Sequence, residues 1–416
     1  MKRIVMIVEN MYPRDPRVRK EANTLAGQGY DVSVIALRGC GEPRRETVDG
    51  VHVLRVPNAK KLFRKSVSKD DIDSRKIVAL AGTIFGYLLE HVYFTLISFF
   101  LSLWVWAKYG LDIIHLHNPP DTLVFIGAFY KLFGKKYVFD HHDLSPELYR
   151  VRCRGKNGFI DTMLMFMEKL SCTIADCVIT TNESYKQIEV RRHKINSNKI
   201  TVVRNDPVMD EINGGHLKRN ASGNDKPALL FLGTINPQDG VNTLLMALHI
   251  LIYQMKANNF TCNILGDGDC LKESISVAKK LQLSSYVDFK GYVSDREMVR
   301  QFLCNADIGV EPAPVNELNW NSTFIKVTEY MAAGKPVVAF DLKETRYSVD
   351  RGGVLVPVNS PMDFAAAIKT TLDDSKLRKR LGKIGQARVK KQLNWTAASS
   401  NLIKAYSRLY NENLQL

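Results

Sequence analysis

The sequence predicts an α/β protein made of two doubly wound halves, each a parallel sheet covered by helices. Along the 416 residues, short apolar segments rich in β-branched residues alternate with longer segments of helical periodicity. A glycine-rich polar stretch at 206–227 interrupts this alternation once. A chain of this length is also too long for one ordinary hydrophobic core. We therefore expect an N-terminal domain over 1–205, a linker over 206–227 and a C-terminal domain over 228–395.

The first half begins with a short apolar strand and a helix with clear end signals. Asp15 and Pro16 suit the N-cap and the first turn of that helix, and Gly27 and Gly29 mark its end. A second helix is predicted over 158–174. The predicted strands span 3–8, 31–37, 51–56, 112–117, 136–140, 176–181 and 200–204. Strands that alternate with helices form right-handed βαβ units around a parallel sheet.

The second half repeats the pattern after the linker. Its predicted strands span 228–233, 261–265, 287–290, 307–310, 336–340 and 354–358. Helices over 376–391 and 396–412 follow the last strand, and the segment 396–416 is a candidate to cross back to the first domain. Binding loops in such sheets lie beyond the carboxyl ends of the strands. Two halves of this kind predict a ligand cleft between the domains.

Residues 77–107 are apolar on nearly every face. The uninterrupted apolar part, 92–107, is shorter than the roughly 20 residues that a membrane-spanning helix needs. Basic residues precede the segment at 60–65, and Trp104 and Trp106 lie near its end. This pattern favours a helical pair that docks on an anionic membrane surface. A helix inside the domain and a true membrane span remain the alternatives.

The composition indicates an anionic partner. The formal net charge is +15 and the isoelectric point is about 9.4, which suits nucleic acid, lipid head groups or a phosphorylated substrate. The cations are spread out and lack the spacing of DNA-binding motifs, so nucleic acid is disfavoured. The seven cysteines are scattered without a CxxC pair, which predicts neither zinc nor disulfides and fits a reducing cytosol.

The segment NSTFIKVTEYMAAGKPVVAFD contains the best candidate for a ligand-binding helix. Ser322 and Thr323 offer N-cap oxygens, and Gly334 suits a left-handed helix end before a buried strand. Lys326 and Glu329 stand three residues apart, so both project from one face near the positive end of the helix dipole. Together they suit a ligand with phosphate and sugar hydroxyls. The alternative is a solvated ion pair.

Histidines end two neighbouring predicted strands. We expect His115 and His117, which alternate along one strand, to point to opposite faces of the sheet. His117 lies nearer the loop and is then the candidate for the binding site, while His115 packs within the sheet. His141, His142 and Asp143 follow the next strand. Adjacent histidines on a strand diverge, so hydrogen bonding or capping is favoured there over zinc.

Residues 232–245, LGTINPQDGVNTLL, leave a strand, turn at Pro237 and Gly240, and enter a helix. Main-chain N–H groups and a helix start in this layout can cradle a phosphate, although such units are common. A second loop holds Asp267 and Asp269, a DxD pattern that either binds a divalent metal or forms a turn. No further carboxylate stands at ligand spacing, so the turn is favoured and no metal is expected.

Taken together, these segments resemble the family 4 glycosyltransferases of the GT-B fold, in which two Rossmann-like domains face a central cleft that holds the active site. The resemblance covers essentially the whole chain and looks closest to bacterial enzymes that build surface polysaccharides and O-antigen units, often on a lipid-linked acceptor. It rests on DPRVRKEANTLAGQGYDVSVIAL (15–37), DIIHLHNPPDTL (112–123), FDHHDLSPELY (139–149), FLGTINPQDGV (231–241), FKGYVSD (289–295) and KVTEYMAAGKPVVAFDLKETR (326–346).

The resemblance implies a retaining, metal-independent enzyme without a cofactor. It would move a hexose or N-acetylhexosamine from a nucleoside diphosphate sugar, with UDP favoured, to a lipid-linked saccharide. Glu329 matches the second glutamate of the family's paired motif and would hold the ribose hydroxyls, and His117 matches the histidine near the transferred sugar. The candidates for the acceptor site or cleft are Arg17, His141, His142 and Asp143. The protein would lie on the inner face of the cytoplasmic membrane.

Three positions depart from the family's pattern. Asn321 replaces the first glutamate of the pair, and Thr234 and Asp239 replace the arginine and lysine that commonly bind the diphosphate. A diphosphate near Asp239 without a cation would be unfavourable, so the positive charge must come from elsewhere. Lys326 is the first candidate for that charge. The other donor-site candidates are Gly233, Gly240, Arg204 and Arg346.

Two other functions stay open. A nucleotide-sugar epimerase or hydrolase on the same fold would convert the donor without a lipid acceptor. A non-catalytic relative would have lost diphosphate binding. The replacements at positions 234 and 239 are the observation that supports this alternative.

Overall fold

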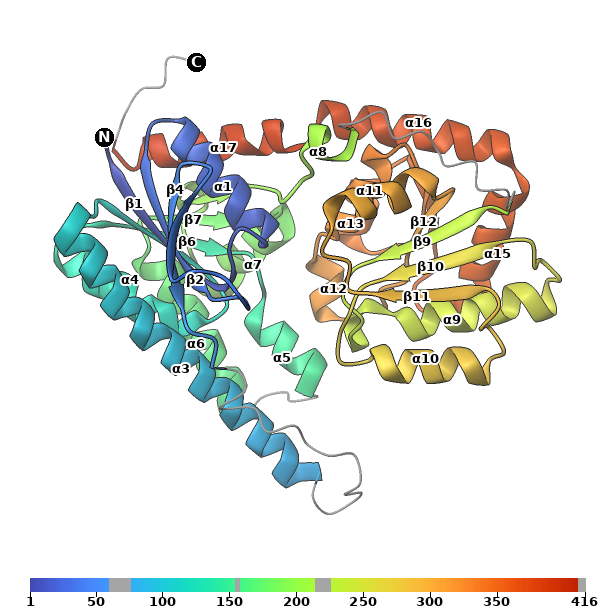
Figure 1. The fold of residues 1–416 in the computed structure, drawn as a ribbon, viewed down its shortest axis with the longest axis horizontal. Coiled ribbons are helices and arrows are strands. Elements are labelled where there is room, and N and C mark those ends of the chain that lie inside the picture. The colour runs from blue at the N-terminus through green and yellow to red at the C-terminus, as the bar shows by residue number, and fades with distance from the viewer. Residues whose placement is uncertain (60–75, 154–157, 214–225, 411–416) are drawn as a thin grey trace. The chain divides into compact units, whose positions relative to one another are not determined.

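The computed structural model describes residues 1–59, 76–153, 158–213 and 226–410. The chain forms two compact units, each with its own sheet (Figure 1). Unit 1 comprises Met1–Pro146, Lys156–Val203 and Ser399–Leu416, and unit 2 comprises Glu147–Gly155 and Arg204–Ala398. The C-terminal segment therefore belongs to the first unit, and a short piece of the predicted first domain belongs to the second.

Unit 1 is built on an eight-stranded sheet in the order β3-β4-β2-β1-β5-β6-β7-β8. The strands are β1 Arg3–Met11, β2 Asp31–Leu37, β3 Arg45–Val48, β4 Val51–Val56, β5 Ile113–His117, β6 Lys136–His141, β7 Cys177–Thr180 and β8 Ile200–Val202. All neighbouring strands pair in parallel except β3 and β4. The seven predicted strands are confirmed. The edge strand β3 was not predicted because its sequence, RETV, is mostly polar and no residue in it is buried.

The helices of unit 1 pack against this sheet. They are α1 Pro16–Gly27, α3 Lys76–Tyr109, the short η1 Asp121–Leu123, α4 Val124–Leu132, α6 Phe159–Ile174, α7 Glu183–His193 and the short η2 Ser197–Lys199, while α5 Ser145–Cys153 and α17 Trp395–Arg408 each lie partly in unit 2. The predicted start of α1 is confirmed: the Asp15 side chain accepts hydrogen bonds from the N–H groups of Arg17 and Val18. Phe94 of α3 and Ile126 of α4 belong to the same buried core.

Residues 76–109 form one helix of 34 residues, so the predicted helical pair is wrong. The segment contains no proline, and isolated glycines weaken a helix without breaking it. Phe94 and Val105 are buried in the core of unit 1. Among the described residues, Gly86–Tyr109 is long and apolar enough to cross a membrane by length and composition, and 33% of its most apolar window is buried.

Unit 2 holds a six-stranded parallel sheet in the order β11-β10-β9-β12-β13-β14. The strands are β9 Ala228–Leu232, β10 Thr261–Leu265, β11 Val287–Gly291, β12 Ile308–Glu311, β13 Val337–Phe340 and β14 Gly353–Val356. The six predicted strands are confirmed. Phe231 lies in one buried apolar cluster and Leu230 in another, because a parallel sheet of this kind is covered on both faces.

The helices of unit 2 connect these strands. They are α8 Met209–Asn213, η3 Pro237–Asp239, α9 Val241–His249, η4 Ile250–Gln254, α10 Leu271–Lys280, α11 Arg296–Asn305, α12 Glu317–Asn321, α13 Ile325–Ala332, α14 Lys343–Val349, α15 Pro361–Asp373 and α16 Ser375–Lys391. Helix α8 falls within the predicted linker 206–227. Residues 214–225 of that linker lie outside the described residues.

Candidate functional site

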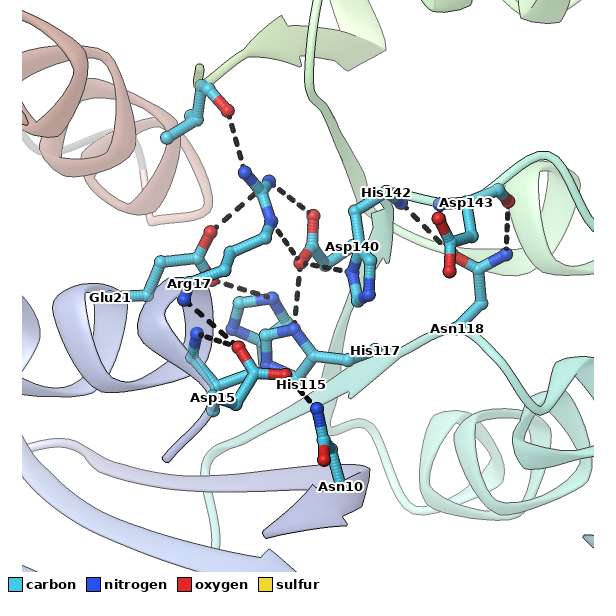
Figure 2. A network of polar contacts seen from close by, with 12 residues as sticks. Asn10, Asp15, Arg17, Glu21, His115, His117, Asn118, Asp140, His142 and Asp143 are labelled. Atoms are coloured by element: carbon cyan, nitrogen blue, oxygen red, sulfur yellow. Dashed lines mark hydrogen bonds and ion pairs between the residues drawn. The ribbon is translucent and has the colours of Figure 1, made fainter. Parts of the chain in front are cut away.

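A buried polar network lies at the carboxyl ends of β5 and β6 in unit 1 (Figure 2). Arg17 of α1 binds Asp140 of β6 in a bidentate manner: Nε donates to Oδ2 at 2.7 Å and Nη2 to Oδ1 at 2.6 Å. Its Nη1 donates to the carbonyl oxygen of Val203 at 2.9 Å. Glu21, one helical turn after Arg17, places Oε1 3.2 Å from Nη2. The guanidinium is therefore held between two carboxylates.

His115 and His117 lie on the same face of β5, so the predicted opposite faces are wrong. Side chains alternate along a strand, and residues two apart therefore return to the same side of the sheet. The two rings stack with their centroids 4.2 Å apart, and both side chains are fully buried. His115 consequently belongs to the same network as His117.

The hydrogen bond to Asp140 decides which nitrogen of His117 carries the proton. Nδ1 lies 2.8 Å from Asp140 Oδ2, and an ionised carboxylate can only accept, so the proton is on Nδ1. Nε2 is buried and has no hydrogen-bond partner among the described residues. Burial lowers the pKa of His117, although the hydrogen bond to Asp140 opposes that shift. The ring is therefore neutral at pH 7 and presents an acceptor lone pair at Nε2.

The two carboxylates of the network have opposite pKa shifts. Burial disfavours the charge on Asp140, but the Arg17 cation holds its pKa well below the ordinary value. Burial raises the pKa of Glu21 to about 8, and the Asp140 charge adds to this. Glu21, His115, His117 and Asp140 offer atoms within 4.8 Å of one another in the described part of the chain. The Arg17 guanidinium contacts both carboxyl groups, so the negative charge of Asp140 already has a cationic partner.

The turn after β6 is held by Asn118. Its Nδ2 donates to the carbonyl oxygen of Asp143 at 2.7 Å, and its Oδ1 accepts from the N–H of His142 at 3.0 Å. His142 Nδ1 in turn lies 3.0 Å from Asp140 Oδ2, and 18% of its side chain is exposed. Burial disfavours the imidazolium, but the Asp140 charge raises the pKa of His142. His142 is therefore a predicted residue that both joins the network and reaches solvent.

His141 turns away from this network into a second buried cluster. Its Nδ1 lies 2.7 Å from Glu189 Oε1, and its Nε2 lies 3.5 Å from Glu168 Oε2. Neighbouring strand residues point to opposite faces, which is why His141 and His142 diverge as predicted. Burial opposes the charge on His141, but Glu168 and Glu189 raise its pKa well above the ordinary value. The structure thus places His141 apart from the other acceptor candidates, where it links β6 to α6 and α7.

In unit 2, the loop after β9 has the backbone of the predicted phosphate cradle. Gly233 has a φ of 135° and Gly240 a φ of 73°, both in the region that favours glycine. A Cβ on Gly240 would lie 2.0 Å from the carbonyl oxygen of Pro312, so no side chain fits there. Asp239 caps η3, and its Oδ2 accepts from the Thr234 hydroxyl at 2.9 Å. The two residues that replace the family's cations therefore bind each other and shape the loop.

Lys326 of α13 lies beside this loop. A Cβ built on Gly233 would be 3.2 Å from Lys326 Nζ. Nζ lies 2.9 Å from Oε2 of Glu311, the last residue of β12, and 4.2 Å from the ring centroid of Phe231. Burial raises the pKa of Glu311, and the Lys326 charge lowers it in part. The alternative of a solvated ion pair on the helix surface is wrong, because Lys326 is 10% exposed and pairs with a buried carboxylate.

Phe324, and not Ser322 or Thr323, is the N-cap residue of α13, and it makes no side-chain capping bond. Ser322 follows α12, and its hydroxyl donates to that helix at 2.8 Å. The Thr323 hydroxyl accepts from Arg204 Nη2 at 3.2 Å. The predicted caps are therefore wrong, since both hydroxyls have other partners. Gly334 follows the helix with a φ of 70°, as predicted.

The remaining donor candidates differ in their surroundings. Glu329 is half-buried on α13, one turn after Lys326. Asn321 ends α12, and its Nδ2 donates to a carbonyl oxygen of that helix at 2.9 Å.

Arg204 lies 4.6 Å from a tyrosine ring and 3.4 Å from a carboxylate, both on α14. Arg346 forms a bidentate pair with Asp341 on the surface. In the predicted DxD, Asp267 Oδ1 accepts from the N–H of the next residue, Gly268, at 2.8 Å.

Four buried partners were not predicted. The sequence indicates two of them weakly. Glu21 stands four residues after Arg17, which is the spacing of a helical ion pair, and Glu311 follows a predicted strand directly. Asp140 belongs to the DHHD segment but was placed within the strand. Tyr406, which contacts His115, left no signal because the two residues are 291 positions apart.

Two families of known domains match the chain. Residues 15–206 match the family described as glycosyl transferase 4-like domain, and residues 226–374 match glycosyl transferases group 1. The alpha-D-kanosaminyltransferase of Streptomyces kanamyceticus is 25% identical over 187 residues, which are 44% of this chain and 46% of that protein. The match thus spans under half the length of that curated relative, and the same holds for a second one.

Solved structures share the fold. Sucrose-phosphate synthase from Thermosynechococcus elongatus matches with a TM-score of 0.72 and 20% identity, over 99% of this chain and 100% of that one. The structure of Anabaena HepE in complex with UDP-glucose matches with a TM-score of 0.69 and 13% identity, over 98% of this chain and 100% of that one. The predicted fold class, two Rossmann-like units of the GT-B type, is confirmed.

Proposed function

We propose that this chain, a glycosyltransferase by the families that its two halves match, moves a sugar from a nucleoside diphosphate sugar to a lipid-linked saccharide. The favoured donor carries UDP and a hexose or N-acetylhexosamine, and the product is a unit of a surface polysaccharide such as O-antigen. The observation that carries the proposal is the position of Lys326 beside the loop from Gly233 to Gly240. A cation next to a glycine-rich turn and a helix start is an arrangement that binds diphosphate.

Lys326 replaces the cations that the family usually carries at positions 234 and 239. Glu311 holds the ammonium group in a site with little water, where electrostatic interactions are stronger than in bulk solvent. Charge that develops on the departing diphosphate is then stabilised by a group that is already oriented. We infer that the reaction needs no metal ion and no cofactor. The HepE structure with UDP-glucose supports UDP as the nucleotide.

We propose that transfer retains the configuration of the anomeric carbon. The acceptor hydroxyl attacks from the face that the phosphate leaves: the bond from carbon to phosphate oxygen breaks, the glycosidic bond forms, and the leaving phosphate takes the hydroxyl proton. His117 accepts a hydrogen bond from a sugar hydroxyl at Nε2, and its lack of a partner there supports this role. Arg17 fixes the orientation of the Asp140 carboxylate. His142 and Asp143 are the residues that we propose to bind the acceptor.

Release of nucleoside diphosphate tests the function. The full-length protein is incubated with UDP-, GDP- and dTDP-sugars, with and without membranes that contain lipid-linked saccharides. We expect release that depends on one donor and on the acceptor. Conversion of a donor without acceptor would instead indicate an epimerase or hydrolase. No release with any donor, together with no calorimetric binding of any nucleoside diphosphate, would indicate a non-catalytic relative.

The Glu329→Ala variant is expected to bind UDP about 10- to 100-fold more weakly. A carboxylate that accepts hydrogen bonds from both ribose hydroxyls contributes roughly 1.5–3 kcal/mol. Isothermal titration calorimetry measures the affinity. Glu317→Ala, on the exposed side of the neighbouring helix α12, serves as the control and should bind UDP like the wild type. If Glu329→Ala bound UDP as tightly as the wild type, Glu329 would not be a ligand of the ribose hydroxyls.

We propose further that unit 1 docks on the inner face of the cytoplasmic membrane. Leu88, Val92, Leu96 and Phe100 stand four residues apart and form an exposed apolar stripe along α3, called here the α3 stripe. Exposure along it rises from 39% at Leu88 to 63% at Phe100. Residues of α3 that face the core are buried, so the stripe is not needed to hold the helix in place.

Helix α4 widens the apolar surface beside the α3 stripe. Phe99 of α3 packs edge to face on Phe129 of α4 with the centroids 4.9 Å apart, and Trp106 packs on Phe133 at 5.2 Å. The neighbouring Leu132 is 84% exposed. The two helices lie beside each other in unit 1 (Figure 1). A contiguous apolar surface of this kind marks an interaction site.

Cations and indole rings border this surface. Lys108 Nζ lies 5.0 Å from the Trp104 ring, and Lys135 Nζ lies 5.7 Å from the Trp106 ring. Lysines attract anionic lipid head groups, and indole rings favour the interface between head groups and acyl chains. This combination favours docking over a membrane span.

The Leu96→Glu/Phe100→Glu variant is expected to reduce binding to vesicles that contain phosphatidylglycerol at least tenfold. Two carboxylates on the α3 stripe would have to enter the apolar layer or lift the helix away from it. Cosedimentation with vesicles measures binding, and circular dichroism checks that the helix content is unchanged. Met246→Glu, at a side chain 51% exposed on α9 of unit 2, is the matched control and should bind vesicles normally. Undiminished binding of the double variant would refute docking through the α3 stripe.

A further inference from the structure

Tyr406 brings the C-terminal helix α17 to the histidines of β5. Its side chain is 1% exposed, and its hydroxyl oxygen lies 2.7 Å from His115 Nδ1. The Tyr30 ring packs edge to face on the Tyr406 ring, with the centroids 5.6 Å apart. The phenol is therefore held in one place behind the pair of stacked imidazoles. The chemistry proposed above gives no role to Tyr406 or to His115.

The surroundings keep both groups of this hydrogen bond neutral. Burial lowers the pKa of His115 well below its ordinary value, and the nearby His117 adds to this. Burial also raises the pKa of Tyr406 well above its ordinary value, so the phenol keeps its proton. When the phenol donates to Nδ1, the imidazole carries its own proton on Nε2, which faces Glu21 Oε2 at 3.8 Å.

We propose that Tyr406 is a positioning residue for the proposed transfer, because its hydroxyl holds His115 as a neutral ring stacked on His117. The inference rests on the role proposed for His117. The ring centroids are 4.2 Å apart, so a proton on His115 would place a positive charge against His117 and weaken the lone pair at its Nε2. The other charged or titratable groups of this network are Arg17 and Glu21 from α1 and Asp140 and His142 from β6 and its turn.

The Tyr406→Phe variant tests this role without changing the packed ring. Loss of the hydroxyl removes a hydrogen bond to the neutral form of His115, so the ring takes up a proton more readily. The acidic limb of the pH profile of kcat/KM should move to higher pH by about one unit. Activity on the alkaline side of that limb should stay within about twofold of the wild type.

Tyr410→Phe is the matched control. Its hydroxyl lies 3.5 Å from the carbonyl oxygen of Asp112, two residues beyond the end of α17 and outside the histidine network. The same atom is thus removed close to Tyr406 without touching His115. The pH profile of Tyr410→Phe should coincide with that of the wild type. A displaced profile in Tyr410→Phe, or an unmoved one in Tyr406→Phe, would overturn the inference.

A second readout does not depend on activity. Nuclear magnetic resonance of the full-length protein with ¹⁵N-labelled histidine reports the protonation of His115 as a function of pH, with His115→Gln to assign the signal. We expect the Tyr406→Phe variant to protonate His115 at higher pH than the wild type does. Identical titrations in the two proteins would refute the hydrogen bond's role. A third outcome is that the His115 titration shifts in Tyr406→Phe but the wild-type protein transfers no sugar from any donor. The proposed function would then be wrong, although the hydrogen bond from Tyr406 would still keep His115 neutral.

Discussion

The Asp140→Ala variant is expected to lose about 3–5 kcal/mol of the free energy of unfolding. Asp140 is fully buried, accepts two hydrogen bonds from Arg17, and is also bonded to His117 and His142. Its removal leaves the Arg17 cation buried without its bidentate partner, and an uncompensated buried charge is costly. Urea-induced unfolding, followed by circular dichroism and tryptophan fluorescence, measures the loss.

The chain contains a matched control for this variant. Arg346 and Asp341 form a bidentate pair with the same two distances, 2.7 and 2.6 Å, but on the surface. Exposed ion pairs contribute little to stability because water and salt screen them, so Asp341→Ala should unfold almost like the wild type. Equal losses in Asp140→Ala and Asp341→Ala would refute the argument from burial.

The stability difference between the wild type and Asp140→Ala should depend on pH. The folded state holds the pKa of Asp140 well below its ordinary value, so the carboxylate stabilises the fold above the pKa of the unfolded chain, about 3.9. This stabilisation is lost as pH falls from there toward the folded pKa. The part of the difference that comes from the Asp140 charge should therefore shrink below about pH 4.

The Lys326→Met variant is expected to bind UDP about 10- to 100-fold more weakly. A hydrogen bond between an ammonium group and a phosphate oxygen contributes roughly 1.5–3 kcal/mol when both groups are charged. Methionine keeps the length of the side chain and its contact with Phe231 but removes the charge. Calorimetric titration with UDP measures the affinity. Lys369→Met removes a cation from the surface pair with Asp373 on α15, and its UDP affinity should equal that of the wild type.

The effect of Lys326→Met on stability can be distinguished from its effect on UDP binding, because the stability effect depends on Glu311. In Lys326→Met, the Glu311 carboxylate is buried without its cation, and burial already raises its pKa. A group with a raised folded pKa stabilises the fold at low pH and loses that contribution as pH rises through it. Lys326→Met should therefore be closer to the wild type in stability at pH 5 than at pH 8.

The Glu311→Gln/Lys326→Met variant completes this experiment. A neutral amide in place of the carboxylate removes most of the buried charge, so stability at pH 8 should recover relative to Lys326→Met. UDP binding should stay weak, because the ammonium group is still missing. If UDP affinity recovered together with stability, Lys326 would be a structural residue and not a ligand for the diphosphate.

The strands and most helix ends were predictable from sequence because their causes are local. A parallel strand covered on both faces is a short, nearly continuous apolar run, and most of the predicted strands have this character. Asp15 before Pro16, and Gly334 after α13, act within one turn of the helix that they bound. The predicted opposite faces of His115 and His117 are wrong, because residues two apart on a strand share a face.

The partners of the buried charges could not be predicted in the same way. Arg17 and Asp140 are 123 positions apart, and they meet because β6 and the start of α1 reach the same edge of the sheet. The pair of Lys326 with Glu311 likewise depends on how the strands and helices of unit 2 pack together.

The sequence by itself therefore determined the fold class, the order of strands and helices, and the residue types available for donor and acceptor sites. Only the tertiary structure decided that Lys326 pairs with Glu311, that His141 leaves the site, and that Tyr406 reaches His115. The physical reason is range. Apolar periodicity and helix capping act over a few residues, whereas a buried charge selects its partner from whatever the packed sheet brings within about 3 Å.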